Sequence, residues 1–516
     1  MRIQYALESQ LEATLEASGA QNRVCGIVMD VNTGAILGSS VKPDFNLNDP
    51  YVLDIISQTK LDESGYSEDS EEYAALKRDL RLAMWNNKVL NDIYEPGSTF
   101  KIITSAMVLE EGLVKTDEHF YCSGSHLVPG YSRPIHCHKL VGHGDVTFAR
   151  GLQQSCNPVM MSIVERLGKE SFCEYFKSFG YLEKTGVDLP GEASTYFFTN
   201  MGPVELATSS FGQGFKVTAL QQITAICTVA NGGYLVTPHF MKEFTDDNGN
   251  VVATYDTTAK RQVLSTETCR TIVNILEEGV SGDGAARNAY VPGYRVAAKT
   301  GTSQKMDKPD ENGEFSLRIG SCVAFAPADD PQVAVLIMVD EPSKGNSYGS
   351  VVAAPYVANV MKSILPYLDI EAEYTEDELA KLEVNVPNYT SWLLEDAVKS
   401  VGYLGVECEV VGEGTLVTAQ IPEGGSLLTK ESGKIILYTG EEKPVSTVKV
   451  PDVMGKTATV ANSVIINSGL NIRITGTTNY ENGVGAVVVS QTPAAGETVA
   501  RGTIVTVEFR YLDGTD

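Results

Sequence analysis

The sequence predicts an α+β fold, with a large domain built on an antiparallel sheet covered by helices, followed by two small α+β modules. Three observations support this prediction. The chain of 516 residues is long enough for more than one domain. Strand patterns lie towards both ends of residues 1–367, with helical patterns between them. After an acidic stretch, the rest of the chain contains one pattern twice.

The large domain, residues 1–367, is expected to begin with an amphipathic helix over 1–19. Two strands should follow within 23–40, on either side of the turn Asn32-Thr33-Gly34. Apolar residues that alternate or run without a break predict the other strands at 295–305, 321–328 and 332–342. Helical spacing of apolar residues predicts five more helices, at 98–111, 145–167, 218–230, 266–279 and 352–364.

The acidic residues 368–382 are expected to form a linker, followed by modules at 383–443 and 447–512. The first halves of the two modules align without a gap, so that Pro387 matches Pro451 and Gly405 matches Gly469. The second halves align once a short insertion around 478–485 is allowed. Each module is therefore predicted to be a helix followed by strands.

Composition narrows the class of protein. Lys and Arg total 40 against 66 Asp and Glu, and the formal net charge of -26 repels nucleic acids and anionic lipid surfaces. The nine cysteines lie far apart and do not form the framework of a small disulfide-rich domain. No apolar run approaches the roughly 20 residues of a membrane span, and no signal peptide is evident. We expect a soluble chain that lacks a membrane anchor.

The first candidate site is the segment "YEPGSTFKIIT". Pro96 and Gly97 end the preceding element, so Ser98 should lie at the N-terminus of a helix, with Lys101 three residues later on the same face. The helix dipole disfavours a protonated lysine there, and a neutral amine beside a hydroxyl makes an activated nucleophile. The alternative is a capping serine and a solvated lysine.

The second candidate site is Ser155-Cys156-Asn157, just before Pro158 and a predicted helix. Alternating side chains would place the Ser155 hydroxyl and the Asn157 amide on one side, where they can relay a proton and hold a carbonyl or Lys101. A capping serine and a turn asparagine are the alternative.

The third candidate site is the strand end Lys299-Thr300-Gly301-Thr302. A lysine and a hydroxyl suit the binding of a carboxylate, and Gly301 leaves room for the backbone of a ligand. An ordinary strand end would look the same.

The three patterns S-x-x-K, S-x-N and K-T-G occur in the order typical of penicillin-recognising serine acyltransferases. With their surroundings, "GHGDVTFARGLQQSCNPV" and "FGQGFKVTALQ" among them, they make residues 1–367 resemble the transpeptidase domain of class B penicillin-binding proteins. The two modules resemble PASTA modules. Together they are most similar to the branch that contains the sporulation-specific and division-specific enzymes of Gram-positive bacteria.

The resemblance implies a peptidoglycan D,D-transpeptidase. Ser98 would attack the carbonyl of a D-Ala-D-Ala stem peptide, and Lys101 would accept its proton. Ser155 would pass a proton to the departing D-alanine, and Asn157 would orient the peptide and Lys101. No cofactor is needed for this chemistry, and β-lactams would stop the enzyme at the acyl stage.

The same resemblance assigns the third motif to substrate binding. Lys299, Thr300 and Thr302 would bind the terminal carboxylate, next to Gly301. The backbone N–H groups of Ser98 and Thr302 would form the oxyanion hole. It further implies a position on the outer face of the cell membrane and partners in wall synthesis such as a glycosyltransferase.

Alternatives to the transpeptidase remain open. A D,D-carboxypeptidase uses water as the acceptor but usually lacks PASTA modules, and a β-lactamase needs a base for deacylation that the sequence does not offer. Cys156 stands where β-lactamases commonly have aspartate, and Ala298 stands where many relatives have glycine. A non-catalytic wall-binding scaffold is the alternative from another class. The modules show few aromatic residues for a sugar, namely Tyr389, Trp392 and Tyr403, so a spacer or partner-docking role also fits.

Five of the six histidines and two cysteines lie within 119–143, which suggests a metal. Two thiolates and one or two imidazoles form a typical tetrahedral zinc set. Cys122, Cys137 and His143 are the preferred ligands, with His138 or His136 as the fourth and Asp145 as a substitute. The alternatives are a Cys122–Cys137 disulfide and side chains without a ligand.

Overall fold

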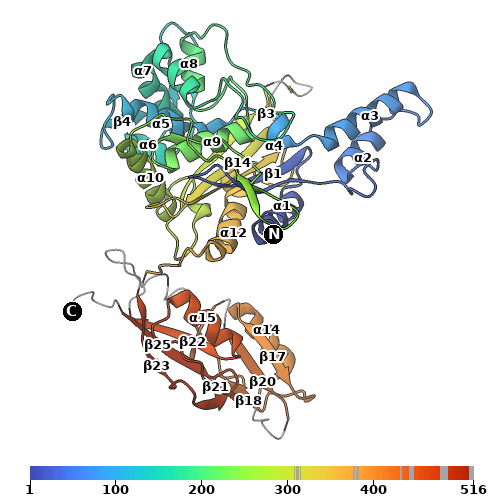
Figure 1. The fold of residues 1–516 in the computed structure, drawn as a ribbon, viewed down its shortest axis with the longest axis vertical. Coiled ribbons are helices and arrows are strands. Elements are labelled where there is room, and N and C mark those ends of the chain that lie inside the picture. Colours follow the sequence, from blue (N-terminus) through green and yellow to red (C-terminus); the bar gives the residue numbers. More distant parts are fainter. Residues whose placement is uncertain are drawn as a thin grey trace. The chain divides into compact units, whose positions relative to one another are not determined.

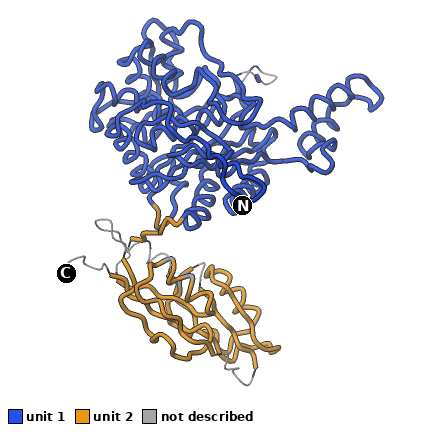
Figure 2. The backbone as a smooth tube through the Cα atoms, in the orientation of Figure 1, with its two compact units in different colours: residues 1–291, 295–368 blue, residues 292–294, 369–516 orange. Residues whose placement is uncertain are grey.

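The computed structural model describes residues 1–510 except 307, 310–312, 314, 376–377, 379–382, 431–432, 441–446 and 477–485. The chain divides into two compact units, one of residues 1–291 and 295–368, the other of 292–294 and 369–516 (Figure 2). The predicted insertion at 478–485, and the predicted linker at 376–377 and 379–382, lie outside the described residues.

The first unit is built on a five-stranded sheet with the order β13-β14-β15-β1-β2, in which every neighbouring pair is antiparallel (Figure 1). β15 is buried along its whole length, because helices cover both faces of the sheet. β13 lies at the sheet edge. The strands are β1 (Arg23–Asp30), β2 (Ile36–Lys42), β13 (Ala297–Gln304), β14 (Arg318–Ala326) and β15 (Val333–Asp340).

Helices cover the two faces of this sheet, which confirms the predicted α+β class (Figure 1). On one face, Gly26 of β1 lies against Leu7 and Leu11 of the first helix. On the other, Ile27 belongs to the core that the middle helices complete. The first face carries α1 (Arg2–Ser18) and α12 (Ala354–Ile364), and the second carries α9 (Ala219–Ala230) and α10 (Thr266–Ser281), against which α5 (Lys101–Glu110) packs.

Two predicted helices are interrupted at the candidate motifs. The helix expected at 98–111 begins as a 3-10 turn, η1 (Gly97–Phe100), before α5. The helix expected at 145–167 is instead a short strand and two helices, which residues 154–156 separate. Ser155 has a left-handed φ of 57°, which ends the first helix, and Pro158 starts the second. These elements are β7 (Gly144–Thr147), α6 (Phe148–Gln153) and α7 (Asn157–Ser178).

Two helices that the sequence analysis did not predict, α2 (Ile55–Asp62) and α3 (Glu71–Trp85), form an arm (Figure 1). Side-chain caps from Asp54 and Ser70 start them. Only Met84 of α3 is buried, so the apolar stripe that reveals a helix is missing.

The remaining elements of the first unit are short. The helical ones are α4 (Lys88–Asn91), α8 (Pro203–Ser209), η2 (Arg287–Ala289), α11 (Gly349–Val352) and η3 (Pro366–Leu368). The strands are β3 (Ile93–Tyr94), β4 (His119–Cys122), β5 (Ser125–His126), β6 (Ile135–His136), β8 (Val217–Thr218), β9 (Tyr234–Leu235), β10 (Glu243–Thr245), β11 (Val251–Thr254) and β12 (Arg261–Gln262).

Within the part of the chain that the structure describes, one segment, Gly349–Leu368, has the length and mean hydropathy, 1.2, of a membrane span, which was not expected from the sequence. Half of it is buried inside the unit. It includes α12, which packs against α1, β14 and β15. A helix that covers a sheet is apolar for the same reason as one that spans a bilayer, so its composition agrees with a core position.

The second unit contains two modules of the same topology. In each, a parallel strand pair is extended by an antiparallel strand, in the orders β17-β20-β18 and β22-β25-β23. The equivalent Ala397 and Ala461 are fully buried, and the equivalent Gly405 and Gly469 have left-handed φ angles after the helix. The elements are β16 (Glu383–Asn385), α14 (Leu394–Leu404), β17 (Glu407–Val411), β18 (Ala419–Ile421), β19 (Leu427–Thr429), β20 (Lys434–Tyr438), β21 (Thr447–Lys449), α15 (Ala458–Asn467), β22 (Asn471–Gly476), β23 (Val487–Thr492), β24 (Thr498–Ala500) and β25 (Ile504–Arg510).

Candidate active site

The turn that carries Ser98 is held against the edge of the sheet. Gly97 has a left-handed φ of 56°, and its N–H donates to Gly212 O at 2.9 Å. A Cβ atom at Gly97 would come within 3.0 Å of Thr302 O, so a side chain there would push the turn away from β13. Glycine therefore allows Ser98 and the third motif to lie close together.

Lys101 joins the first motif to the second. Its side chain is completely buried. The Nζ atom donates to Asn157 Oδ1 at 2.7 Å, to Ser155 Oγ at 3.1 Å and to the Ser155 carbonyl at 2.5 Å. This geometry excludes the alternative of a solvated surface lysine.

Lys299 brings the third motif to the same serine. Its Nζ atom lies 3.0 Å from Ser155 Oγ and 2.9 Å from Thr300 O, and its side chain is also buried. The Ser155 hydroxyl therefore lies between the amines of Lys101 and Lys299. A hydroxyl that contacts two amines can pass a proton between them.

Burial changes the charge of both amines. It lowers the pKa of Lys101 from 10.5 to about 8, against the opposing effect of nearby cysteine thiols. Burial, with the nearby Lys101 amine, also lowers the pKa of Lys299 well below its usual value. Two ammonium groups that share one hydroxyl repel each other, so the site favours one neutral lysine near neutral pH.

The backbone at Ser155 is strained. Its φ of 57° lies in the left-handed region, which a residue with a Cβ atom rarely adopts. The turn ends α6 and directs the Ser155 hydroxyl towards both lysines. Strain of this kind is typical of functional sites, where surrounding contacts hold it in place.

A cleft of about 650 Å³ opens beside this network. In the described part of the chain, no hydrogen bond joins Ser98 Oγ to Lys101 Nζ, although the sequence analysis expected the two groups to meet. The Lys101 amine is used instead by Ser155 and Asn157. The cleft is lined by six of the residues predicted for catalysis and substrate binding, namely Ser98, Ser155, Asn157, Thr300, Gly301 and Thr302.

Gly301 has a packing role besides the expected one of leaving room for a ligand. A Cβ atom there would come within 2.5 Å of Ser321 Oγ and 3.0 Å of Pro96 O. The glycine is therefore required by the packing of β13 against β14 and the Ser98 turn.

The segment that contains the candidate metal ligands forms one wall of the cleft. His136, Cys137 and His138 line it. The Asn157 amide donates to His136 O at 3.2 Å. The wall and the second motif are thus in direct contact.

The cysteines of this wall gather with a cysteine of the second motif. Ligand atoms of Cys122, Cys137, His143 and Cys156 all lie within 4.8 Å of one another. All nine cysteines are free, so Cys122 and Cys137 are not joined in a disulfide. The hydrogen bond between the two thiols lowers the pKa of Cys137 and raises the pKa of Cys156, so the shared proton stays on Cys156.

The fourth member of this cluster differs from the predicted one. Cys156 takes the position expected for His138 or His136, because the turn at Ser155 brings the second motif against the wall. His138 Nδ1 lies 3.8 Å from Cys137 Sγ, outside the cluster. Asp145, the predicted substitute, contacts His119 at 3.1 Å instead.

A buried polar chain that the sequence analysis missed supports the Ser98 turn. Tyr181 Oη donates to Gln222 Oε1 at 2.8 Å, and Gln222 Nε2 donates to Thr99 Oγ1 at 3.2 Å. Thr99 in turn donates to Pro96 O at 2.8 Å. Polar residues inside apolar helical patterns, such as Gln222 in "ALQQITAI", were the available signal.

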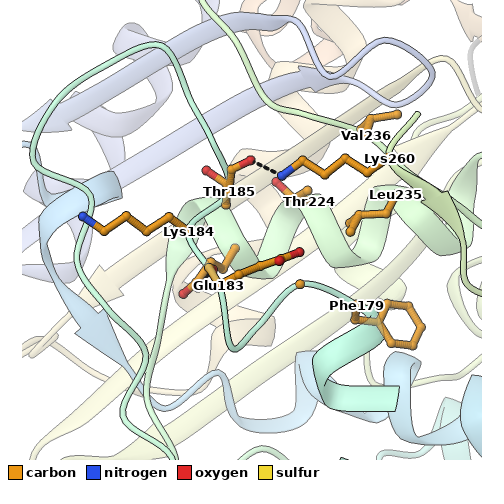
Figure 3. A pocket seen from close by; sticks show the side chains of 10 residues that line it. Phe179, Glu183, Lys184, Thr185, Thr224, Leu235, Val236 and Lys260 are labelled. Atoms are coloured by element: carbon orange, nitrogen blue, oxygen red, sulfur yellow. Dashed lines mark hydrogen bonds between the residues drawn. The ribbon is translucent and has the colours of Figure 1, made fainter. Parts of the chain in front are cut away.

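A second pocket, shown in Figure 3, carries no comparable chemistry. Its cavity volume is about 10 Å³, which is roughly the space of one water molecule. Its Lys260 donates to Thr185 O at 2.6 Å, an interaction drawn in the figure. The amine is therefore used in holding two segments together.

Comparison with known families agrees with this architecture. The model of the penicillin binding protein transpeptidase domain matches residues 24–362. The PASTA domain model matches residues 384–441 and 448–510. The chain belongs to the penicillin-binding protein transpeptidase family and carries two PASTA domains, which confirms the predicted resemblance.

The chain is also similar to individual members of this family. The chain is 37% identical to stage V sporulation protein D of Bacillus subtilis over 454 residues, covering 86% of this chain and 64% of that protein. It is 31% identical to penicillin-binding protein PbpB of Mycolicibacterium smegmatis over 356 residues, covering 66% and 49%. The solved transpeptidase domain of Burkholderia pseudomallei penicillin-binding protein 3 is 25% identical, with a TM-score of 0.57, covering 72% and 96%. The chain thus spans less than two thirds of these curated relatives.

Proposed function

We propose that the protein is a serine D,D-transpeptidase that cross-links peptidoglycan stem peptides ending in D-Ala-D-Ala. The observation that carries the proposal is the buried network of Lys101, Ser155, Asn157 and Lys299 beside Ser98. Three motifs separated by more than fifty residues supply these groups, and they converge at the cleft. Relatives named peptidoglycan D,D-transpeptidase support the same activity.

Acylation begins when Ser98 Oγ attacks the carbonyl carbon of the penultimate D-alanine. The hydroxyl proton passes to the neutral amine of Lys101, and the backbone N–H groups of Ser98 and Thr302 stabilise the oxyanion. The C–N bond then breaks. The nitrogen of the departing D-alanine takes its proton through the Ser155 hydroxyl, which contacts both Lys101 and Lys299.

Deacylation completes the cross-link. The amine of a second stem peptide attacks the ester carbonyl, and its proton leaves by the same groups in reverse. Asn157 accepts a hydrogen bond from Lys101 and so keeps the amine in place throughout. Ser98 recovers its proton when the ester bond breaks.

The third motif binds the terminal carboxylate of the substrate in this proposal. Lys299, Thr300 and Thr302 supply an amine and two hydroxyls, of which Thr300 and Thr302 line the cleft. A bound carboxylate raises the pKa of the Lys299 amine again, because it favours the ammonium form. Substrate binding therefore leaves Lys299 charged and Lys101 neutral.

The cleft disfavours a β-lactamase. A β-lactamase needs a base that activates water for deacylation, and none of the described residues that line the cleft is acidic. The assembled site also disfavours a non-catalytic scaffold, since a scaffold has no need for two buried lysines.

We expect penicillin to form one stable covalent adduct with the wild-type protein and none with Ser98→Ala, because only the hydroxyl of Ser98 can be acylated. Intact-protein mass spectrometry measures the adduct. Ser105→Ala, which changes a buried serine on α5 away from the cleft, is the matched control and should still be acylated. Loss of the antibiotic without an adduct would contradict the proposal and favour a β-lactamase. An intact antibiotic without an adduct would favour the scaffold.

The rate of acylation by penicillin is expected to rise with pH. Lys101 must be neutral to accept a proton, and its pKa lies at about 8. The neutral fraction, and with it the rate, should rise about tenfold per pH unit below pH 8 and level off above it. Stopped reactions between pH 6 and pH 9 measure this profile. A flat profile with a folded protein would show that Lys101 is not the base.

A structural zinc ion bound by Cys122, Cys137, His143 and Cys156 is part of the proposal. Zinc–sulfur bonds of about 2.3 Å place the ligand atoms of a tetrahedral site about 3.8 Å apart. Cys137 Sγ and His143 Nδ1 already lie 3.7 Å apart. Three free thiols and one imidazole within 4.8 Å therefore fit zinc with small movements. The metal would tie the cleft wall to the second motif and take no part in the reaction.

The substrate implies where the protein works. Stem peptides are cross-linked outside the cell membrane, so the proposed site of action is the extracytoplasmic face. A glycosyltransferase that supplies the glycan strands is the proposed partner. The PASTA pair belongs to the same assembly in this proposal, as a spacer or a docking module.

A further inference from the structure

One cation in the cleft has no role in the proposed chemistry. Arg318, the first residue of β14, lines the cleft and is half-buried. Among the described residues, no carboxylate or carbonyl accepts a hydrogen bond from its side chain. The described lining of the cleft also contains no acidic residue, although the protein carries a net charge of -26. A guanidinium that has no partner among the residues that the structure describes is suited to an anionic ligand.

The sheet register places Arg318 beyond the third motif. Arg318 pairs with Gln304, and Gly320 pairs with Thr302. Residues that face each other in an antiparallel pair share a sheet face, and so do alternate residues of one strand. The Arg318 side chain therefore lies on the face of Thr300, Thr302 and Gln304. It continues their row away from the Lys299 end.

A stem peptide bound as proposed runs along this row. Its terminal carboxylate lies at Lys299 and Thr300, and its scissile carbonyl lies between Ser98 and Thr302. An extended chain advances about 7 Å in two residues. The third residue of the stem, just before D-Ala-D-Ala, thus lies near Thr302, and a long side chain from it reaches Gln304 and Arg318.

Gln304 complements the arginine. Its Nε2 atom donates to Phe315 O at 3.0 Å, so its Oε1 atom points elsewhere. Among the described residues, no hydrogen bond uses that oxygen. Arg318 can donate to a carboxylate while Gln304 Oε1 accepts from an ammonium group. The pair is complementary to a zwitterionic amino-acid head group.

We propose that Arg318 and Gln304 select stem peptides whose third residue carries a distal carboxylate and amine, as meso-diaminopimelic acid does. The inference rests on the proposed transpeptidase function and names its substrate class. A third-residue lysine would bring only an ammonium group, which the guanidinium repels. Arg318 acts on specificity and takes no part in bond making.

The test compares synthetic pentadepsipeptide donors that end in D-Ala-D-lactate and differ only at the third residue. One carries meso-diaminopimelate, one carries its amide and one carries L-lysine. Release of D-lactate, with D-alanine as the acceptor, gives kcat/KM for each donor. We expect the diaminopimelate donor to exceed the other two by about tenfold or more in the wild type. Arg318→Gln should bring the ratios close to one.

Controls separate this inference from the proposed function. Arg270→Gln removes an exposed arginine on α10 and should keep the wild-type ratios. Acylation of Arg318→Gln by penicillin, which does not reach the third-residue position, is measured alongside and shows whether the variant still has a working Ser98. Equal kcat/KM values for all donors in the wild type, or unchanged ratios in Arg318→Gln, would overturn the inference. If penicillin still acylates the protein, the proposed transpeptidase function stands in either case. Failure of penicillin and of every donor would overturn both.

Discussion

Replacing Lys101 by methionine is expected to slow the acylation of Ser98 by penicillin about 100- to 10,000-fold, the range that a general base contributes. The Lys101 amine is the group that contacts both Ser155 Oγ and Asn157 Oδ1. Because burial lowers its pKa to about 8, a fraction of the protein molecules carry this amine in its neutral form at physiological pH. Methionine has a similar length but cannot accept a proton. The rate of adduct formation, followed by intact-protein mass, measures the effect.

Two further measurements show whether the loss comes from the base. The residual rate of Lys101→Met should no longer follow a titration near pH 8. Its thermal midpoint should fall moderately, because the buried acceptors Asn157 Oδ1 and Ser155 O lose their donor although the cost of burying the amine is also removed. Lys77→Met, on the exposed arm, is the matched control. Rapid acylation of Lys101→Met would show that Lys101 is not the base and would favour Lys299 in that role.

The sequence predicted the elements whose signals are local. Apolar runs predicted β14 and β15, because strands buried on both faces contain few polar residues. The order of the three motifs predicted which residues belong to the site. Lys101 and Lys299 each lie in a motif that is specific for one kind of chemistry. The arm of α2 and α3 was missed because its helices bury almost nothing.

The break at Ser155 and the position of Cys156 depend on contacts between residues that are distant in the sequence, and a local sequence pattern does not reveal such contacts. The sequence predicted a continuous helix over 145–167, but the left-handed turn at Ser155 divides it. That turn exists because contacts with Lys101 and Lys299 hold it, and both lysines are distant in the sequence. The same turn moves Cys156 against Cys137, which explains why Cys156 rather than His138 completes the thiol cluster.

Removal of the proposed zinc is expected to slow acylation by penicillin about 100-fold, because Cys156 lies between two catalytic residues and small displacements of such groups are costly. Ser155 and Asn157 flank Cys156, and the Asn157 amide also bonds the wall at His136 O. Without the metal, no coordinate bond would link the thiols of the cleft wall to the thiol of Cys156 in the second motif. We expect the thermal midpoint to fall as well, and added zinc to restore both properties.

Elemental analysis gives the direct measurement. The purified protein should contain one zinc ion per chain, and Cys137→Ser should contain much less. Cys173→Ser, which changes a half-buried thiol outside the cluster, should retain the metal and the wild-type acylation rate. A mass lower by two hydrogen atoms, without zinc, would establish the Cys122–Cys137 disulfide instead. A metal-free protein with reduced thiols and unchanged acylation would show that packing alone holds the second motif against the wall.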